Sequence, residues 1–205
     1  MDLVEFIRPY TKTSPERIAA WVAALAYIDR ENIPGDIVEC GVWRGGNIIL
    51  ARKLSPDRVC WLYDTFSGMT QPSAADGLKA NELYKHKTQA GIPMSGASLD
   101  KVMAAISECG VYDGDKLRFV EGDVCETLSQ LECRPAHIAL LRLDTDWYDS
   151  TAAELEYLYP LLSVGGVLIV DDYGHWPGAR QAVDDYFGPD VAKEMIDYTA
   201  CRIIK

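Results

Sequence analysis

Short runs of apolar residues alternate along this chain with segments in which apolar residues recur at helical spacing. Such runs are typical of buried strands. They cover residues 36–40, 58–63, 117–121, 138–143 and 164–170. Because helical segments lie between the runs, the pattern predicts an α/β domain with a doubly wound, mostly parallel sheet.

The predicted helices begin at residues that suit a helix start. Ser14 can cap a helix and Pro15 suits its first turn, and the apolar residues that follow recur on one face. That face contains Trp21 and Leu25, so this helix is expected to cover the sheet or a partner subunit. Further helices are predicted over residues 47–54, 98–109, 124–131, 150–162 and 179–187.

The two ends of the chain do not follow this alternation. Residues 1–33 are predicted to form a helical segment, in which Pro9 interrupts the first part. Residues 194–198 and 201–204 predict an antiparallel hairpin at the edge of the sheet. No linker or internal repeat divides the sequence, so residues 1–205 are expected to form a single domain.

Residues 65–97 contain no clear strand and are rich in glycine, proline, serine and methionine. A short helix is expected near residues 78–87. A loop of this length inside a compact domain is usually functional or mobile. The segment is therefore interpreted as a lid over the site, with an ordinary insertion as the alternative.

Carboxylates stand at the points where two long apolar runs end. Asp144 follows a run in which Arg142 is the only polar residue, and Asp171 and Asp172 follow the next run. Ligands of an open parallel sheet bind outside the carboxyl ends of its strands, so neighbouring strands would bring these three carboxylates together. Carboxylates packed in this way repel one another, and a hard cation relieves the repulsion. Magnesium is the predicted metal.

The first predicted strand leads into a glycine-rich turn. Gly41, Gly45 and Gly46 precede a helix, and this arrangement lets a ligand approach backbone amides. The spacing differs from the G-x-G-x-x-G dinucleotide fingerprint, and a tight turn alone also needs glycine. Asp64 ends the second strand, where its carboxylate can accept hydrogen bonds from two ribose hydroxyls or can cap a turn.

Several other residues have two open interpretations. Asp123 can face an adenine edge or cap the helix that follows it. His175, in the loop after the aspartate pair, is either a general base or an ordinary loop histidine. Trp147 and Tyr148 can form a wall of the site or pack in the core, and Arg44 can pair with a carboxylate or remain solvated.

The composition is that of an acidic globular protein. The formal net charge of −11 argues against nucleic acid or an anionic membrane as a partner, although an acidic surface also serves solubility. The six cysteines show no CxxC spacing, and Cys40 and Cys60 lie in apolar runs, so reduced thiols and a cytoplasmic location are expected. No signal peptide or membrane-spanning run is predicted.

Four motifs, in the same order from about residue 34 onward, resemble those of the macrocin O-methyltransferase family. They are Glu39-Cys40-Gly41-Val42-Trp43-Arg44-Gly45-Gly46, Tyr63-Asp64-Thr65-Phe66-Ser67-Gly68-Met69, Leu143-Asp144-Thr145-Asp146-Trp147-Tyr148-Asp149-Ser150-Thr151 and Val170-Asp171-Asp172-Tyr173-Gly174. These enzymes methylate sugar hydroxyls on macrolides and other natural products with S-adenosylmethionine and magnesium. The resemblance implies a Rossmann-like class I methyltransferase fold and a magnesium-dependent O-methyltransferase. The chain departs from the family in being shorter before the first strand and in having a lid without a clear substrate signature.

Carried onto this sequence, the resemblance assigns roles to the motifs. The cofactor residues would be Glu39, Gly41, Gly45 and Gly46 for the methionine portion, Asp64, Ser67 and Gly68 for the ribose, and Asp123 and Val124 for the adenine. Asp144, Asp171 and Asp172 would bind magnesium, which would lower the pKa of the acceptor hydroxyl. Asp144 is the first choice for the base that takes its proton, and His175 is the second.

Other functional classes remain open at this stage. Asp144-Thr145-Asp146 also resembles the first motif of aspartate-nucleophile phosphatases and the DxD metal site of nucleotide-sugar glycosyltransferases. Neither class explains Asp64 and the glycine turn as well. A binding protein that keeps the cofactor fold without turnover is a third alternative. The expected partner is a small-molecule hydroxyl acceptor. A homo-oligomer is also expected, and the apolar face with Trp21 and Leu25 would suit a dimer contact.

Overall fold

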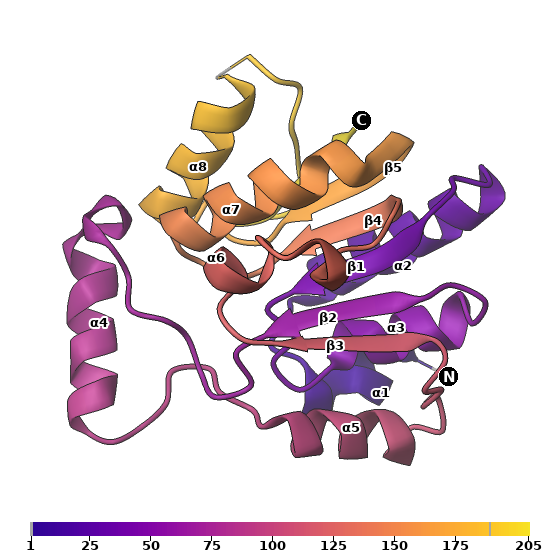
Figure 1. The fold of residues 1–205 in the computed structure, drawn as a ribbon, viewed down its shortest axis with the longest axis horizontal. Helices are drawn as coiled ribbons and strands as arrows, with labels where there is room; N and C mark the ends of the chain where they lie inside the picture. Colours follow the sequence, from indigo (N-terminus) through magenta and orange to yellow (C-terminus); the bar gives the residue numbers. More distant parts are fainter. Residues whose placement is uncertain (1, 189) are drawn as a thin grey trace.

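A seven-stranded sheet forms the centre of the protein, with helices on both of its faces (Figure 1). The computed structural model describes residues 2–188 and 190–205. The strand order is β3-β2-β1-β4-β5-β7-β6. Strands β1 to β5 run parallel, whereas β7 is antiparallel to both β5 and β6. The predicted doubly wound, mostly parallel sheet with an antiparallel C-terminal edge is confirmed.

The strands follow the apolar runs closely. They are β1 (Asp36–Cys40), β2 (Cys60–Asp64), β3 (Leu117–Glu121), β4 (Ile138–Leu143), β5 (Leu162–Val170), β6 (Glu194–Met195) and β7 (Cys201–Ile204). Every residue of β4 is buried, because helices cover both faces of the sheet at this strand. The predicted bounds hold for β1, β3, β4 and β7, while β2 begins later, β5 begins earlier and β6 is shorter than predicted.

A helix is present in each segment where one was predicted, but several helices begin or end at other residues than predicted. The helices are α1 (Leu3–Ile7), α2 (Pro15–Arg30), α3 (Gly46–Leu54), α4 (Gly77–Gln89), α5 (Leu99–Glu108), α6 (Val124–Thr127), α7 (Tyr148–Leu158) and α8 (Pro177–Phe187), with short 3-10 turns at Arg8–Tyr10, Ala74–Asp76, Leu131–Cys133 and Tyr159–Leu161. Ser14 caps α2 as predicted, because its hydroxyl accepts a hydrogen bond from the Arg17 amide. Ser98 precedes α5 without such a bond.

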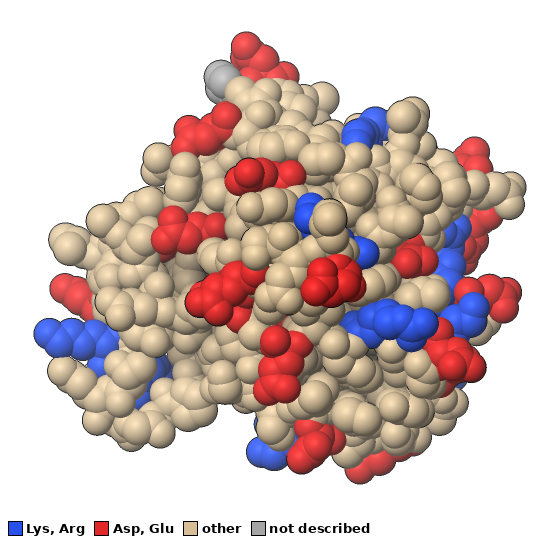
Figure 2. All heavy atoms as spheres, in the orientation of Figure 1, with Lys and Arg blue, Asp and Glu red and all other residues tan. Residues whose placement is uncertain are grey.

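Two apolar clusters fill the space on the two faces of the sheet. Alternate strand residues belong to different clusters, so Leu140 contributes to one and Leu141 to the other. The first cluster packs under α1, α2, α3 and α5, and the second packs under α6, α7 and α8. Acidic side chains are spread over the outer face shown in Figure 2, as the net charge leads one to expect.

Helix α2 belongs to the protein's own core. Trp21 is 1% exposed and Leu25 is 0% exposed, and Trp21 Nε1 donates a hydrogen bond of 2.9 Å to the Asn47 carbonyl of α3. The expectation that this helix covers the sheet is therefore confirmed, and the alternative that its apolar face forms a dimer contact is wrong, because the sheet and α3 already cover that face. The expectation of a homo-oligomer stays a prediction.

The segment 65–97 carries α4, which stands at the side of the molecule in Figure 1. Ala80 of α4 packs in a small cluster with Trp147, Trp176 and Ala179, separate from the two main clusters. The Asp76 carboxylate accepts a hydrogen bond of 2.7 Å from the Tyr148 amide at the start of α7. These contacts hold the segment against the residues that follow β4, and its role as a lid stays a prediction.

The remaining expectations concern cysteines and membranes. All six cysteines are free, and Cys40 and Cys60 are buried as predicted. Among the described residues, no helix has the length and apolar content needed to cross a membrane.

Candidate active site

A cavity opens at the carboxyl ends of the central strands and draws residues from every predicted motif. The predicted site residues that line it are Glu39, Gly41, Gly46, Asp64, Gly68, Asp123, Val124, Asp144, Asp171 and Asp172. Gly45, Ser67 and His175 are outside this lining. The strand-end placement of ligand-binding residues in open α/β sheets accounts for the convergence.

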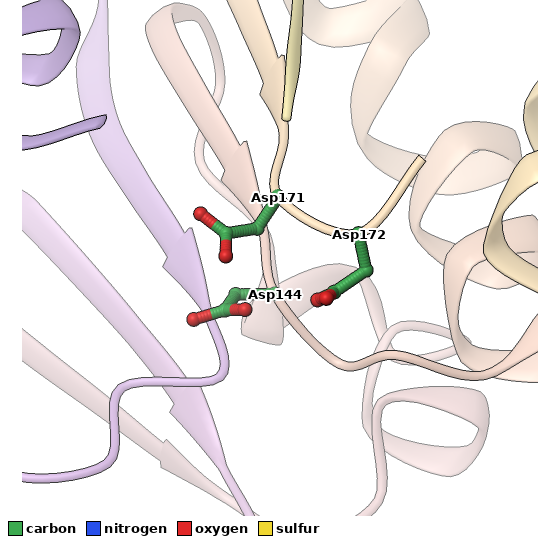
Figure 3. A group of neighbouring side chains, drawn as sticks. All are labelled: Asp144, Asp171 and Asp172. Atoms are coloured by element: carbon green, nitrogen blue, oxygen red, sulfur yellow. The ribbon is translucent and has the colours of Figure 1, made fainter. Parts of the chain in front are cut away.

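Asp144, Asp171 and Asp172 point toward one another from the ends of β4 and β5 (Figure 3). One carboxylate oxygen from each lies within 4.8 Å of the other two. The register of the sheet explains this, because the last residues of β4 and β5, Leu143 and Val170, are direct partners. The predicted meeting of the three carboxylates is confirmed.

Arg142 lies within this group and compensates part of its charge. The buried guanidinium donates hydrogen bonds to Glu39 Oε1 (2.9 Å), Asp144 Oδ2 (2.8 Å) and Asp171 Oδ1 (2.5 Å). Arg17 of α2 forms an ion pair with the other oxygen of Asp171. A metal is therefore not the only group that can relieve the repulsion, because two arginines already offset part of it.

Burial strongly affects the titration of this group. It raises the pKa of Asp144 well above its usual range, against the opposing effect of Arg142, and it also raises the pKa of Asp172. Burial raises the pKa of Glu39 to about 7, although Arg142 and Asn47 act to lower it. Burial is thus the largest effect on these carboxyl groups, and the arginines offset only part of it. A bound cation would favour the ionised forms of the carboxyl groups.

Two of the residues that line the cavity each have a buried carboxylate oxygen without a hydrogen-bond partner among the described residues. The two oxygens are Oδ2 of Asp172 and Oε2 of Glu39. Buried acceptors are normally paired, so both oxygens are free to receive a ligand. The donor set of carboxylate oxygens fits a hard cation at Asp172, and the Glu39 oxygen fits an ammonium group.

Backbone amides fix Asp64 at the end of β2. Its Oδ2 accepts hydrogen bonds from the amides of Val42 (2.8 Å) and Trp43 (3.0 Å), and its Oδ1 accepts one from the amide of Phe66 (2.9 Å). The turn needs glycine at Gly41, where φ is +82° and a Cβ would lie 2.1 Å from the Asp144 carbonyl oxygen. Asp64 is therefore a turn anchor that also faces the cavity.

The remaining predicted cofactor residues differ in their positions. Asp123 caps α6 by accepting a hydrogen bond of 2.9 Å from the Cys125 amide, and it also lines the cavity, so both interpretations of this residue are compatible. Gly45 faces Val102 of α5 instead of the cavity. Ser67 is exposed to solvent.

His175 lines a separate pocket together with Trp176, Arg180 and Asp184. Its ring packs edge to face on Trp176, with centroids 4.7 Å apart. Burial, with the charges of Lys79 and Arg17, lowers its pKa. The structure does not bring His175 into the cavity that contains Asp144, so its position gives no support to a role as the base.

Sequence reasoning missed two acids near the site. Asp146 adopts φ +69° and lines the cavity, and burial raises its pKa to about 7 although a hydrogen bond with Asp172 acts to lower it. Glu154 of α7 is fully buried, and its Oε1 accepts a hydrogen bond of 3.0 Å from Thr145 Oγ1. The Asp-Thr-Asp motif was a usable signal for Asp146, whereas an acid within a predicted helix gave none for Glu154.

The segment before the first strand was given no site role, yet it contributes to the cavity. Its lining residues are Tyr10, Thr11, Lys12, Thr13 and Arg17. This segment packs closely on the glycine turn, since a Cβ at Gly46 would lie 2.8 Å from the Tyr10 carbonyl oxygen. Only the folded structure reveals this contact, because the two segments are far apart in sequence.

Comparison with known proteins gives a consistent result. The Macrocin-O-methyltransferase (TylF) family model matches residues 7–201. The 8-demethyl-8-(2,3-dimethoxy-alpha-L-rhamnosyl)-tetracenomycin-C 4'-O-methyltransferase of Streptomyces olivaceus is 37% identical over 165 residues, which cover 77% of this chain and 60% of the relative. The demethyldecarbamoylnovobiocin O-methyltransferase of Streptomyces niveus is 35% identical over 171 residues, which cover 80% and 63%. The chain thus spans about three fifths of the length of these curated relatives.

Solved structures agree with the fold. The O-methyltransferase NovP superposes with a TM-score of 0.84 at 30% identity, covering 96% of this chain and 82% of NovP. The calicheamicin methyltransferase CalS11 has a TM-score of 0.68 at 19% identity, over 99% of this chain and 91% of that protein. The second likeness concerns the fold alone.

Proposed function

Because this chain belongs to the Macrocin-O-methyltransferase (TylF) family, we propose that it moves the methyl group of S-adenosylmethionine to a hydroxyl of a sugar or another polyhydroxylated natural product. The named relatives are O-methyltransferases of glycosylated tetracenomycin and of a novobiocin precursor. The observation that carries the proposal is the single cavity in which three converging carboxylates lie beside the glycine turn and Asp64. The family match gives no support to the phosphatase or glycosyltransferase alternatives.

The turn end of the cavity is proposed to bind the cofactor. Asp64 would accept hydrogen bonds from the ribose hydroxyls, because its oxygens have lone pairs beyond those used by the backbone amides. The unpartnered Oε2 of Glu39 would accept from the methionine ammonium. Asp123 and Val124 would flank the adenine, and Gly68 would lie along the ribose. Gly45 and Ser67 do not line the cavity, so they would not contact the cofactor and would only help to shape the turns that do.

Asp144, Asp171 and Asp172 are proposed to hold magnesium. Their converging oxygens and the unpartnered Oδ2 of Asp172 support this assignment. When bound, magnesium would act as a Lewis acid that lowers the pKa of the acceptor hydroxyl. Family membership and the three aspartates both favour magnesium over other metals at this site. The metal dependence of turnover tests this assignment.

A carboxylate must accept the proton of the acceptor hydroxyl. Asp144, the first choice from the sequence, already accepts a hydrogen bond from Arg142 and would also ligate the metal, and both contacts lower its basicity. Asp146 lines the same cavity and forms no ion pair with an arginine among the described residues. We therefore favour Asp146 as the base, with Asp144 as the alternative.

The remaining task of the chain is to align the two reacting groups. Methyl transfer from a sulfonium is an in-line displacement, so the acceptor oxygen must lie opposite the leaving sulfur. A cavity with a cofactor end and an acidic end on one rigid sheet provides fixed positions for both partners. Such alignment supplies a large part of the acceleration in bimolecular reactions.

The proposal is tested by calorimetry with S-adenosylhomocysteine and by a methylation assay on a panel of glycosides. We expect micromolar binding of S-adenosylhomocysteine, and turnover that stops with a chelator and returns with magnesium. Binding without turnover on any acceptor would indicate a non-catalytic relative. Absence of binding, with release of phosphate from a generic ester, would contradict the proposal in favour of a phosphatase.

A further inference from the structure

Lys12 is an exposed cation that lines the cavity. Its Nζ lies 4.7 Å from the centroid of the Trp43 ring and donates a hydrogen bond of 3.1 Å to Ser95 Oγ. Lys12, Trp43 and Ser95 line the same cavity as Asp144 and Asp146. An ordinary surface lysine samples many rotamers, whereas contacts with the glycine turn and with the 65–97 segment orient this ammonium group.

The other cavity-lining cations are already committed to carboxylates. Arg17 pairs with Asp171 and Asp197, and Arg142 pairs with Glu39, Asp144 and Asp171. Among the described residues that line the cavity, Lys12 is the cation that forms no ion pair. Its charge is therefore free to meet an anion that enters from solvent.

Further cations gather around Lys12 in a protein whose net charge is strongly negative. The Arg44 guanidinium lies 4.7 Å from the same Trp43 ring, so two cations share one indole. The charges of Arg44 and Lys87 both act on Lys12. Helix α4, which carries Lys87, has three lysines and one glutamate, and basic side chains are visible over it at the left edge of Figure 2. Lys12 thus has basic neighbours at a cavity whose lining is otherwise largely acidic.

The ammonium group of Lys12 packs on Trp43 of the glycine turn, and it shares the cavity with the carboxylates of the acidic end. The carboxylates that act on it most strongly are Asp146 and Asp144, which lie at the acidic end of the cavity. An acceptor hydroxyl placed at this end would share the cavity with Lys12, the lining cation that forms no ion pair among the described residues. Without that cation, the acidic groups would repel any acceptor that carried negative charge.

We propose that Lys12 binds an anionic group of the acceptor, a phosphate or a carboxylate attached to the sugar that is methylated. The inference rests on the proposed function and narrows its acceptor class to nucleotide-linked sugars or acidic glycosides. Arg44 and Lys87 raise the local positive potential and attract such acceptors to the cavity. Lys12 supplies the direct contact, through a charged hydrogen bond.

The test compares acceptors in pairs that differ in charge. The pairs are thymidine-diphosphate-rhamnose with methyl rhamnoside, and methyl glucuronide with methyl glucoside. Lys12→Met is expected to raise the KM of the charged member by about ten- to a hundredfold, the usual effect of losing a hydrogen bond to a charged group. The KM of the neutral member and the Kd of S-adenosylhomocysteine should not change. The two pairs distinguish a phosphate from a carboxylate.

Two further variants make the comparison specific. Lys12→Arg keeps a cation at the same position and should retain the preference for the charged member. Lys101→Met removes a lysine on the exposed face of α5 and should have no effect on either KM. A preference that also disappears in Lys101→Met would reflect net charge and would contradict a direct contact by Lys12.

Other outcomes would overturn the inference. If Lys12→Met weakens S-adenosylhomocysteine binding and leaves acceptor selectivity unchanged, Lys12 serves the carboxylate of the cofactor. Equal use of charged and neutral acceptors by the wild type would also contradict it. If no acceptor is methylated, the anion site can still be tested without turnover. Calorimetry then measures the binding of thymidine diphosphate and of glucuronate to the magnesium-loaded S-adenosylhomocysteine complex. Lys12-dependent binding would support the anion site even where the proposed reaction fails, and absence of binding would reject it.

Discussion

The two ends of the cavity stabilise their carboxylates in different ways. At the turn end, Asp64 accepts hydrogen bonds from three backbone amides and has no ion pair among the described residues. At the acidic end, Asp144 and Asp171 are held by the guanidinium groups of Arg142 and Arg17. Amides contribute dipoles without net charge, whereas each arginine contributes a full positive charge.

This difference matches what each end is suited to bind. A carboxylate held by amides has further lone pairs, and these suit neutral donors such as hydroxyls. A group of carboxylates held by arginines is only partly neutralised, since Glu39, Asp144 and Asp172 all show raised pKa values through burial. The acidic end therefore has a deficit of positive charge, which a cation would remove.

The largest effect is expected from Asp144→Asn at the acidic end. This change keeps the shape of the side chain but removes a proposed metal ligand and the alternative base, so kcat should fall by roughly 10³- to 10⁴-fold. The Kd of S-adenosylhomocysteine, measured by calorimetry, should be nearly unchanged, because the amide-held end is left intact. Asp149→Asn, on the exposed side of the first turn of α7, is the matched control. Retained turnover in Asp144→Asn would remove Asp144 from the proposed metal set.

The next effect concerns stability. Arg142→Met leaves the buried carboxylates of Glu39 and Asp171, and the half-buried one of Asp144, without their shared cation, so the free energy of unfolding should fall by about 3–5 kcal/mol. Urea denaturation at neutral pH measures this loss. The loss should shrink at acidic pH, where the orphaned carboxylates bind protons. Arg118→Met, on an exposed position of β3, is the control, and an equal loss in both variants would show that Arg142 has no special role.

Most of the fold could be predicted because the central strands are buried on both faces. A strand such as β4 then appears as a continuous apolar run whose ends mark the ends of the strand. Helix bounds were less predictable where a distant residue sets them. Helix α7 begins at Tyr148, before the predicted start at Ser150, because Asp76 from the 65–97 segment accepts a hydrogen bond from the Tyr148 amide. No local pattern around Ser150 contains that information.

In the candidate site too, some residues could be predicted from the local sequence and others depend on contacts with distant segments. Asp144, Asp171 and Asp172 were found from the sequence because parallel strands bring their carboxyl ends to one edge. Arg142 was visible as the only polar residue of its run, but its role needed the register of β1 against β4, in which Glu39 and Arg142 are direct partners. The contribution of Lys12 depends on how the segment before the first strand packs over the turn, and nothing in its own residues indicates that packing.

Asp197, a carboxylate outside the cavity, shows how amide hydrogen bonds affect stability at different pH values. Asp197 accepts hydrogen bonds from the amides of Thr199 (2.8 Å) and Ala200 (2.9 Å) and pairs with Arg17 (3.0 Å). Burial acts to raise its pKa, but the hydrogen bonds, led by those from the Ala200 and Thr199 amides, lower it to about 2. This amide-held acid thus titrates in the direction opposite to Glu39 and Asp144.

The sign of the pH effect follows from this pKa. The value in the folded protein lies below the ordinary value of about 3.9 in an unfolded chain, so Asp197 stabilises the fold above about pH 4 and loses this effect as the pH falls toward 2. Asp197→Asn should lower the free energy of unfolding by about 2 kcal/mol at neutral pH, with a smaller difference from wild type near pH 3. Denaturation curves at several pH values measure it. A difference that does not change with pH would mean that the charge of Asp197 contributes nothing.

The smallest effect is expected at the turn end, from Asp64→Asn. An amide side chain has one oxygen, so it can accept hydrogen bonds from the Val42–Trp43 amides or from the Phe66 amide but not from both, and its NH₂ group would face the other set. The Kd of S-adenosylhomocysteine should rise by about tenfold, the lower end of the effect of losing a hydrogen bond to a charged group, while magnesium affinity stays the same. Glu121→Gln is the matched control, because Glu121 is the register partner of Asp64 on β3 and is exposed. If Asp64→Asn weakened magnesium and S-adenosylhomocysteine to the same extent, the two ends of the cavity would act as one charged unit, and the contrast between amide-held and arginine-held carboxylates would have no functional meaning.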